Sequence, residues 1–411
     1  MSQSTLEVAE IFRGHGAAWR EANRGHVSLD QMKVMTAIER CRTVALGGHV
    51  ARCENDACGT TLISYNSCRN RHCPKCQGSA ARRWLAEREA ELLPVPYFHV
   101  VYTLPCQLRD VAYQNKRVVY DLLMKAAAET TLEIAADPKR LGARIGITAV
   151  LHTWGSAMTH HPHVHMIVPG GGVSDDGARW IGSRANFLVH VHVLARLFRA
   201  KFIAMLSAAH TGGLLKFFNT HTGLADRKNF KRFLGPLRHI DWRVHCKPPF
   251  AGPSQVLRYL SRYTHRVAIS NRRLVAAHDG GIAFRWKDYR ANANKIRWKT
   301  MTLPPAEFIR RFLIHVLPKG FHRIRHYGLF ANGNRKEMIA RARQLLGLAM
   351  VAKPKDADPS TAIGDAEGPS VALRPCPCCG ARMLIIEVFA RGETPRHRPS
   401  ARAPPCKSEP S

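Results

Sequence analysis

The sequence predicts an α+β protein, in which an antiparallel sheet is flanked by helices and preceded by a helical, cysteine-rich module. Three observations lead to this prediction. After residue 96, runs rich in β-branched and aromatic residues alternate with long helical stretches. Six of the twelve cysteines fall within residues 41–76. The chain also carries 62 lysines and arginines against 30 aspartates and glutamates, which points to a nucleic-acid partner.

Apolar residues spaced three and four apart predict helices in the N-terminal region. The segments are "TLEVAEIFRGHGAAW", "LDQMKVMTAIERC" and "QGSAARRWLAEREAELLP", and the last one ends at Pro94 and Pro96. We therefore expect residues 1–95 to form a helical, zinc-binding module.

Strands and helices interleave in the rest of the chain. We expect strands over 97–105, 145–155 and 161–172, the last two antiparallel neighbours, and a hairpin over 274–290 that turns at Asp279, Gly280 and Gly281. Helices are expected over 118–136, 187–209, 226–240, 253–266, 303–318 and 335–347. Residues 96–345 should form the catalytic domain. Residues 346–411 read as a disordered tail, rich in proline, alanine and charge, that carries a partial CxxC.

The formal net charge of +32 requires a polyanion to offset self-repulsion. Basic residues are spread along the chain, which favours an extended DNA-binding surface over a basic arm. A basic protein of the ribosomal kind is the alternative. The chain has no apolar run of membrane-spanning length and no signal peptide at its start, so we expect a cytoplasmic, nucleoid-associated protein.

Cysteines in a reducing compartment indicate metal binding. Two turns that each offer two thiolates can close a tetrahedral structural zinc site, and we predict that the ligands are Cys53, Cys58, Cys73 and Cys76. Four further residues are left to form a second site or to pack: Cys41, His49, Cys68 and His72. The "CPCCG" of the tail looks like half a zinc site. Five basic residues in and after the cysteine segment suggest phosphate contacts: Arg69, Arg71, Lys75, Arg82 and Arg83.

The stretch "HHPHVHMIVPGGG" places several imidazoles on one expected strand. Alternate side chains of a strand share a face, so His161, His163 and His165 should point one way, and Val164 and Met166 the other. Two imidazoles at i and i+2 can grip one metal ion. Plain packing of histidines on a sheet surface is the alternative.

The segment "PSQVLRYLSRYTHR" predicts a helix on which Gln255, Tyr259 and Tyr263 lie above one another, flanked by Arg258 and Arg262. A tyrosine phenol is a poor nucleophile at neutral pH. It can attack a phosphodiester if an ion polarises the phosphate and cations favour the phenolate. A core seam of tyrosines is the alternative.

Together these features resemble the HUH endonucleases, and more closely the two-tyrosine rolling-circle transposases of bacterial insertion sequences, whose prototype is insertion sequence ninety-one. The resemblance covers roughly residues 30–335. It rests on "YNSCRNRHCPKCQ", "HVVYTLP", "HPHVHMIVPGGG", "YLSRYTHRVAISN" and "GFHRIRHYGL".

The resemblance implies an HUH-like antiparallel sheet and a divalent ion, Mg²⁺ or Mn²⁺, held by His163 and His165 at the scissile phosphate. Gln255 is the candidate third ligand, with His161 and His265 as rivals. The implied nucleophiles are Tyr259 and Tyr263, which would join to the 5′ phosphate of one DNA strand and free a 3′ hydroxyl. The implied partner is single-stranded or hairpin DNA at the ends of a mobile element. The basic-aromatic "FRWKDYR" is a candidate DNA contact or an ordinary hairpin.

Three other functions remain open on the sequence alone. A plasmid relaxase or replication initiator would share the chemistry. A zinc-ribbon DNA-binding regulator would not cleave DNA, and a metal-dependent phosphoesterase would cleave it without a covalent adduct.

Overall fold

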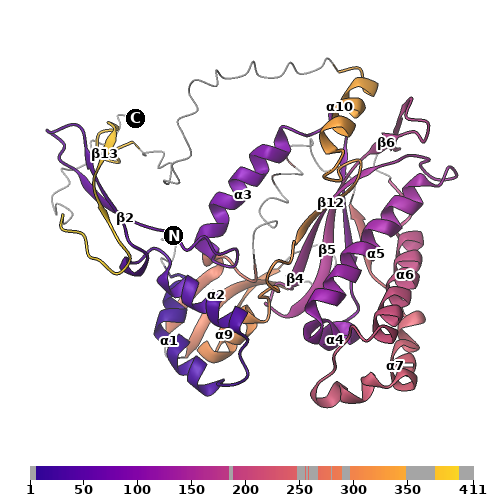
Figure 1. The fold of residues 1–411 in the computed structure, drawn as a ribbon, viewed down its shortest axis with the longest axis horizontal. Coiled ribbons are helices and arrows are strands. Elements are labelled where there is room, and N and C mark those ends of the chain that lie inside the picture. The colour runs from indigo at the N-terminus through magenta and orange to yellow at the C-terminus, as the bar shows by residue number, and fades with distance from the viewer. Residues whose placement is uncertain are drawn as a thin grey trace.

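The main sheet of the computed structural model has the strand order β12-β4-β5-β3-β8, and each adjacent pair is antiparallel (Figure 1). The described residues are 6–184, 188–247, 255, 258, 267–278, 280–288, 297–348 and 375–397. The strands are β3 (Tyr97–Thr103), β4 (Gly146–Trp154), β5 (His160–Pro169), β8 (Val244–Lys247) and β12 (Ile324–Gly328). The predicted α+β fold with an antiparallel sheet is confirmed. No helix among the described residues is long and apolar enough to cross a membrane.

One face of this sheet is buried under α5 (Lys116–Ala136) and α6 (Val191–Thr211), which pack against each other (Figure 1). The inward side chains of the central strand, Val164, Met166 and Val168, are fully buried in this core. Two shorter helices, α4 (Arg109–Gln114) and α7 (Arg227–Leu234), extend the layer. The apolar face of the sheet is thus buried against these helices, and polar groups can lie on the opposite face.

The opposite face carries α3 (Pro74–Glu89) and α10 (Arg335–Leu345) at one end. Trp84 of α3 and Ile339 of α10 share a small core with Tyr97, Ile167 and Phe330. In Figure 1, α3 lies on the side of the sheet away from α5 and α6. A short pair of strands, β6 (Gly171–Val173) and β7 (Trp180–Gly182), follows β5.

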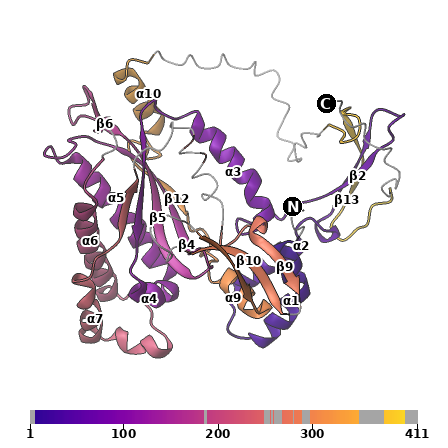
Figure 2. The same cartoon turned by 180° about the vertical axis from the view of Figure 1, so that it is seen from behind.

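The N-terminal helices pack on a second sheet built from much later residues (Figure 2). The helices α1 (Val8–Ala22) and α2 (Leu29–Arg40) share a core with α9 (Pro305–Leu313) and with the sheet β11-β10-β9. Its strands are β9 (Leu274–His278), β10 (Gly281–Asp288) and β11 (Arg297–Leu303). The ring of Phe12 meets that of Phe312 edge to face at 5.2 Å. The expected boundary at residue 95 therefore does not enclose the core of the N-terminal helices.

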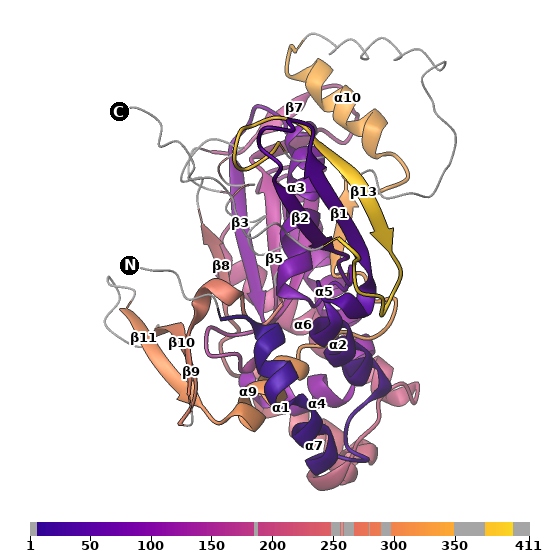
Figure 3. The ribbon, with the colours of Figure 1, turned by 90° about the vertical axis from the view of Figure 1, so that its left-hand side faces the viewer.

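A third sheet, with the order β13-β1-β2, stands beside α2 and α3 (Figure 3). Its strands are β1 (Gly48–Cys53), β2 (Thr61–Tyr65) and β13 (Met383–Phe389). The expectation that residues 346–411 form a tail without structure is corrected for residues 375–397, because backbone pairing with β1 orders β13. Residues 349–374 and 398–411 lie outside the described part of the chain.

Candidate metal centres and catalytic face

The polar face of the main sheet gathers histidines from three neighbouring strands. His163 and His165 project from β5 on the side opposite to Val164 and Met166, as the strand alternation predicts. In the antiparallel register His163 lies opposite His152 of β4 on one side and Thr103 of β3 on the other.

A third imidazole completes a possible metal site here. One ring nitrogen each from His152, His163 and His165 lie within 4.8 Å of one another. The rings of His152 and His165 are 4.2 Å apart between centroids, and Trp154 stacks on His152 at 4.5 Å. The cluster is therefore held rigidly by the sheet register and by an aromatic ring.

Hydrogen bonds to Nδ1 orient both β5 histidines. Nδ1 of His163 donates to the backbone carbonyl of His161 at 2.6 Å. Nδ1 of His165 lies 2.6 Å from Nε2 of His99 on β3, whose ring stacks parallel to it. With protons on both Nδ1 atoms, each Nε2 keeps a free lone pair, and Nε2 of His165 is buried without a hydrogen-bond partner among the described residues. This is the arrangement that metal-binding histidines adopt.

Burial keeps these imidazoles uncharged at neutral pH. It lowers the pKa of His163 to about 3 and that of His165 well below its ordinary value, because a charged ring would lose its hydration. Burial likewise lowers the pKa of His99 to about 4. Neutral rings can bind a cation through their lone pairs. The three-histidine cluster is therefore suited to a divalent ion.

Positive side chains lie close to the histidine face. Burial is the largest cause of the low pKa of His99 and His161. Lys247 of β8 lowers the pKa of His99 further, and Arg109 lowers that of His161 further. These cations would attract an anionic ligand to the same place.

The helix that carries the predicted nucleophiles is described at two positions only. Gln255 and Arg258 are helical and exposed, and Nε of Arg258 pairs with Oε1 of Glu89 in α3 at 2.8 Å. Tyr259, Tyr263 and His265 lie outside the described residues. Gln255 as third ligand stays a prediction. The rival His161 is not one of the three clustered rings.

The cysteines form two groups of four within the described part of the chain, and each group brings its sulfurs within 4.8 Å of one another. The first consists of Cys41, Cys68, Cys73 and Cys76, and the second of Cys53, Cys58, Cys376 and Cys379. The predicted single site of Cys53, Cys58, Cys73 and Cys76 is corrected by this division. The pair Cys53 and Cys58 cannot share an ion with the pair Cys73 and Cys76, because Cys53 ends β1 and Cys58 lies between β1 and β2, both strands of the third sheet.

The first cysteine cluster joins the C-terminal end of α2 to the start of α3. Sγ of Cys76 lies 3.6 Å from Sγ of both Cys41 and Cys68. Cys73 caps α3 and Pro74 opens it, so the helix N-terminus faces thiolates, which its dipole stabilises. Four thiolates leave no open position, which fits a structural zinc ion.

The other residues singled out in this region have structural contacts. The Nε2 atom of buried His72 accepts a hydrogen bond from the backbone of Leu317 at 3.2 Å. Arg71 donates to two backbone carbonyls near residue 320, and Lys75 pairs with Glu7. These two cations are engaged within the protein. The exposed basic residues here are Arg69, Arg82 and Arg83, while His49 is half-buried on β1.

The segment "FRWKDYR" divides between core and surface. Phe284 is fully buried, and Lys287 lies over the exposed ring of Trp298 at 5.1 Å. Tyr289 and Arg290 lie outside the described residues.

Comparisons with known proteins identify the family. The family model "Transposase zinc-binding domain" matches residues 11–104, and the model "Putative transposase" matches residues 146–338. A putative transposase, y4qJ, from Sinorhizobium fredii is 53% identical over 95% of this chain and 97% of the relative. The chain belongs to the IS91 family of transposases. The transposase for insertion sequence element IS801 of Pseudomonas savastanoi pv. phaseolicola is 28% identical over 74% of this transposase and 70% of the relative. No solved structure matches this chain significantly.

Sequence reasoning missed two histidines of the polar face, His99 and His152. Both occur in segments identified as strands, "YFHVVYTLP" and "ITAVLHTWG". The signal that could have found His152 is the expected antiparallel pairing of its strand with β5, which brings polar side chains of neighbouring strands together.

Replacement of Cys73 by serine should remove one zinc ion from the transposase and lower its unfolding temperature. The sulfur belongs to the first cysteine cluster, and metal binding at such sites supplies folding free energy. Zinc content and thermal unfolding of the full chain are the measurements. Cys106→Ser, at an exposed cysteine outside both clusters, is the control. Unchanged zinc content in Cys73→Ser would contradict the assignment.

Proposed function

We propose that this transposase nicks and joins single DNA strands at the ends of a mobile element through a 5′-phosphotyrosine intermediate, as in rolling-circle transposition. The observation that carries the proposal is the cluster of His152, His163 and His165 on the face of the sheet opposite its helical layer. The family membership supports the same conclusion.

The three histidines are the proposed ligands of the catalytic ion. When bound, a divalent ion would polarise a phosphate oxygen and so ease attack at phosphorus. The hydrogen bonds at Nδ1 of His163 and His165 leave their Nε2 atoms available to an ion. Imidazole nitrogens suit Mn²⁺ better than Mg²⁺, which prefers oxygen ligands. We therefore infer that Mn²⁺ binds this site more tightly than Mg²⁺.

The proposed nucleophiles are Tyr259 and Tyr263. A phenol oxygen forms a bond to phosphorus while the bond from phosphorus to the 3′ oxygen of the preceding nucleotide breaks. The phenol proton passes to solvent, and the departing 3′ oxygen takes up a proton. One phosphodiester is thus exchanged for another, so a later attack by a 3′ hydroxyl can rejoin the strand without ATP.

The cations around the histidine face would hold the DNA. Lys247 stands opposite His99 in the pairing of β3 and β8, and Arg109 acts electrostatically on His161. We propose single-stranded DNA or unpaired hairpin ends, in the bacterial nucleoid, as the substrate, as the resemblance to rolling-circle transposases implies.

A cleavage assay tests the proposal. Labelled single-stranded oligonucleotides tiled across the DNA that flanks the gene are incubated with the full chain and Mn²⁺ or Mg²⁺. We expect a nicked product and a protein–DNA adduct that survives denaturing electrophoresis. EDTA should prevent both, and added Mn²⁺ should restore them.

The matched control is the same set of oligonucleotides annealed to their complements. Cleavage without an adduct would indicate a hydrolytic phosphoesterase, and binding without cleavage would indicate a regulator. Either result contradicts the proposal.

A further inference from the structure

The second cysteine cluster brings together an N-terminal and a C-terminal segment of the chain. Its members are Cys53 and Cys58 beside the turn between β1 and β2, and Cys376 and Cys379 just before β13. The matched zinc-binding domain ends at residue 104, so it holds only half of the cluster. We propose that these four cysteines bind a second structural zinc ion, which makes the C-terminal segment part of the zinc-binding module.

The distances between the sulfurs suit a tetrahedral ion. Sγ of Cys53 lies 3.5 Å from Sγ of Cys379, and Sγ of Cys58 lies 3.7 Å from Sγ of Cys376. A zinc ion with Zn–S bonds near 2.3 Å holds its sulfurs about 3.8 Å apart. Disulfides need a separation of about 2.05 Å. The four thiols are therefore spaced for a shared ion and not for cross-links.

The two halves have the same local construction. Each cysteine pair is followed at once by a glycine with positive φ, Gly59 at 57° and Gly380 at 77°. Such residues let the chain turn tightly around an ion. Backbone hydrogen bonds close both turns: the N–H groups of Cys58 and Gly59 donate to the carbonyl of Asn55 at 2.9 and 3.2 Å, and that of Gly380 donates to the carbonyl of Cys376 at 2.9 Å. Two turns of this form are the halves of a zinc ribbon.

Backbone pairing holds the two halves in place. Cys53 lies opposite Met383 in the pairing of β1 and β13. The backbone of Glu54 donates to the carbonyl of Arg382 at 2.9 Å, and the backbone of Arg382 donates to the Glu54 carboxylate at 3.0 Å. The turn that carries the first cysteine pair is thus fixed directly against the start of β13.

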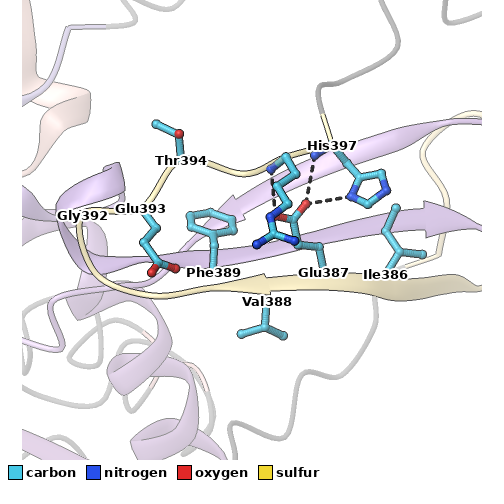
Figure 4. Close-up of a pocket in the computed structure, with 9 residues that line it drawn as sticks. Ile386, Glu387, Val388, Phe389, Gly392, Glu393, Thr394 and His397 are labelled. Carbon is cyan, nitrogen blue, oxygen red and sulfur yellow. Dashed lines mark hydrogen bonds and ion pairs between the residues drawn. The ribbon is translucent and has the colours of Figure 1, made fainter.

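The segment after β13 is also folded onto the third sheet. Glu387 accepts hydrogen bonds from both the backbone and Nδ1 of His397, as Figure 4 shows. It also accepts one from the backbone of Arg396 at 2.8 Å. The backbone of Gly392 donates to the carbonyl of Val44 at 3.0 Å. Residues 375–397 are therefore attached at several points, and not by the cysteines alone.

The apolar core of this region is small. Among the described residues, the cluster around the cysteines buries Ala51, Cys53, Cys376 and Met383, and Val50 and Phe389 are buried elsewhere on the same sheet, whereas Val388 is 77% exposed. Small modules with so little buried surface need a metal or cross-link for stability. An ion here would also close a loop of 318 residues between Cys58 and Cys376, around the whole catalytic domain.

Counting thiolate-bound zinc in the full chain tests the proposal. A thiol-specific mercurial reagent releases only zinc that is bound to thiolates, so an ion held by histidines is not counted. We expect two zinc ions per chain, one for each cysteine cluster. Cys376→Ser should release one, and the neighbouring Cys378→Ser, whose sulfur is outside the four, should release two. One zinc ion in the unmodified chain, or two in Cys376→Ser, would overturn the proposal.

A second measurement needs no substitution and so does not depend on the folding of a variant. Differential alkylation of the native chain, read by mass spectrometry, should find Cys53, Cys58, Cys376 and Cys379 protected together and exposed together on chelation. Rapid alkylation of Cys376 and Cys379 while Cys53 and Cys58 stay protected would disprove the shared site.

Discussion

Alanine at His163 or His165 should reduce strand cleavage by about a thousandfold or more, because the lost ion supplies several kcal/mol of transition-state stabilisation. His152→Ala should have the same effect, since its ring nitrogen lies in the same cluster. His99→Ala should act more mildly, by about 10- to 100-fold, because His99 only orients His165. Nicking rates on a labelled single strand and metal affinity are the measurements.

His161→Ala is the matched control for this series. It removes an imidazole from the same strand but keeps the backbone carbonyl that orients His163. We expect its cleavage rate and DNA affinity to stay near those of the unmodified transposase. DNA affinity should also persist in the His163 and His165 variants, because the cations that contact phosphate remain. Undiminished nicking by His163→Ala or His165→Ala would show that these rings only pack.

The double variant Tyr259→Phe/Tyr263→Phe should form no covalent adduct with single-stranded DNA. Each substitution removes the attacking oxygen and keeps the aromatic ring, so folding should be unaffected. Each single variant should lose transposition, while one type of nick persists if the tyrosines serve different strands. A denaturing gel of labelled DNA, with mass spectrometry of the linked peptide, gives the readout.

Tyr65→Phe serves as the control, at an exposed tyrosine of the third sheet. It should form the adduct at the normal rate. An adduct that persists in the double variant, or one linked to a serine, would disprove the tyrosine mechanism while leaving the histidine site untouched.

Helices and strands were predictable because their signals are local. The period of apolar residues predicts α1, α2, α5 and α6 close to their observed bounds, and alternation along "HPHVHM" predicts which side of β5 carries the histidines and which joins the hydrophobic core. The turn at Gly280 likewise separates β9 from β10. Each of these features depends on residues that are close to one another in the sequence.

The assembly of the sites was decided by contacts between distant segments. His152 reaches His163 through the register of β4 on β5, and Cys376 reaches Cys58 through the pairing of β13 with β1. Residue types and spacing indicated thiolate metal sites, but they grouped Cys53 and Cys58 with Cys73 and Cys76, which the structure separates. The six thiols within residues 41–76 can be grouped in several ways, and backbone hydrogen bonding between strands, not spacing along the chain, selects the grouping that forms.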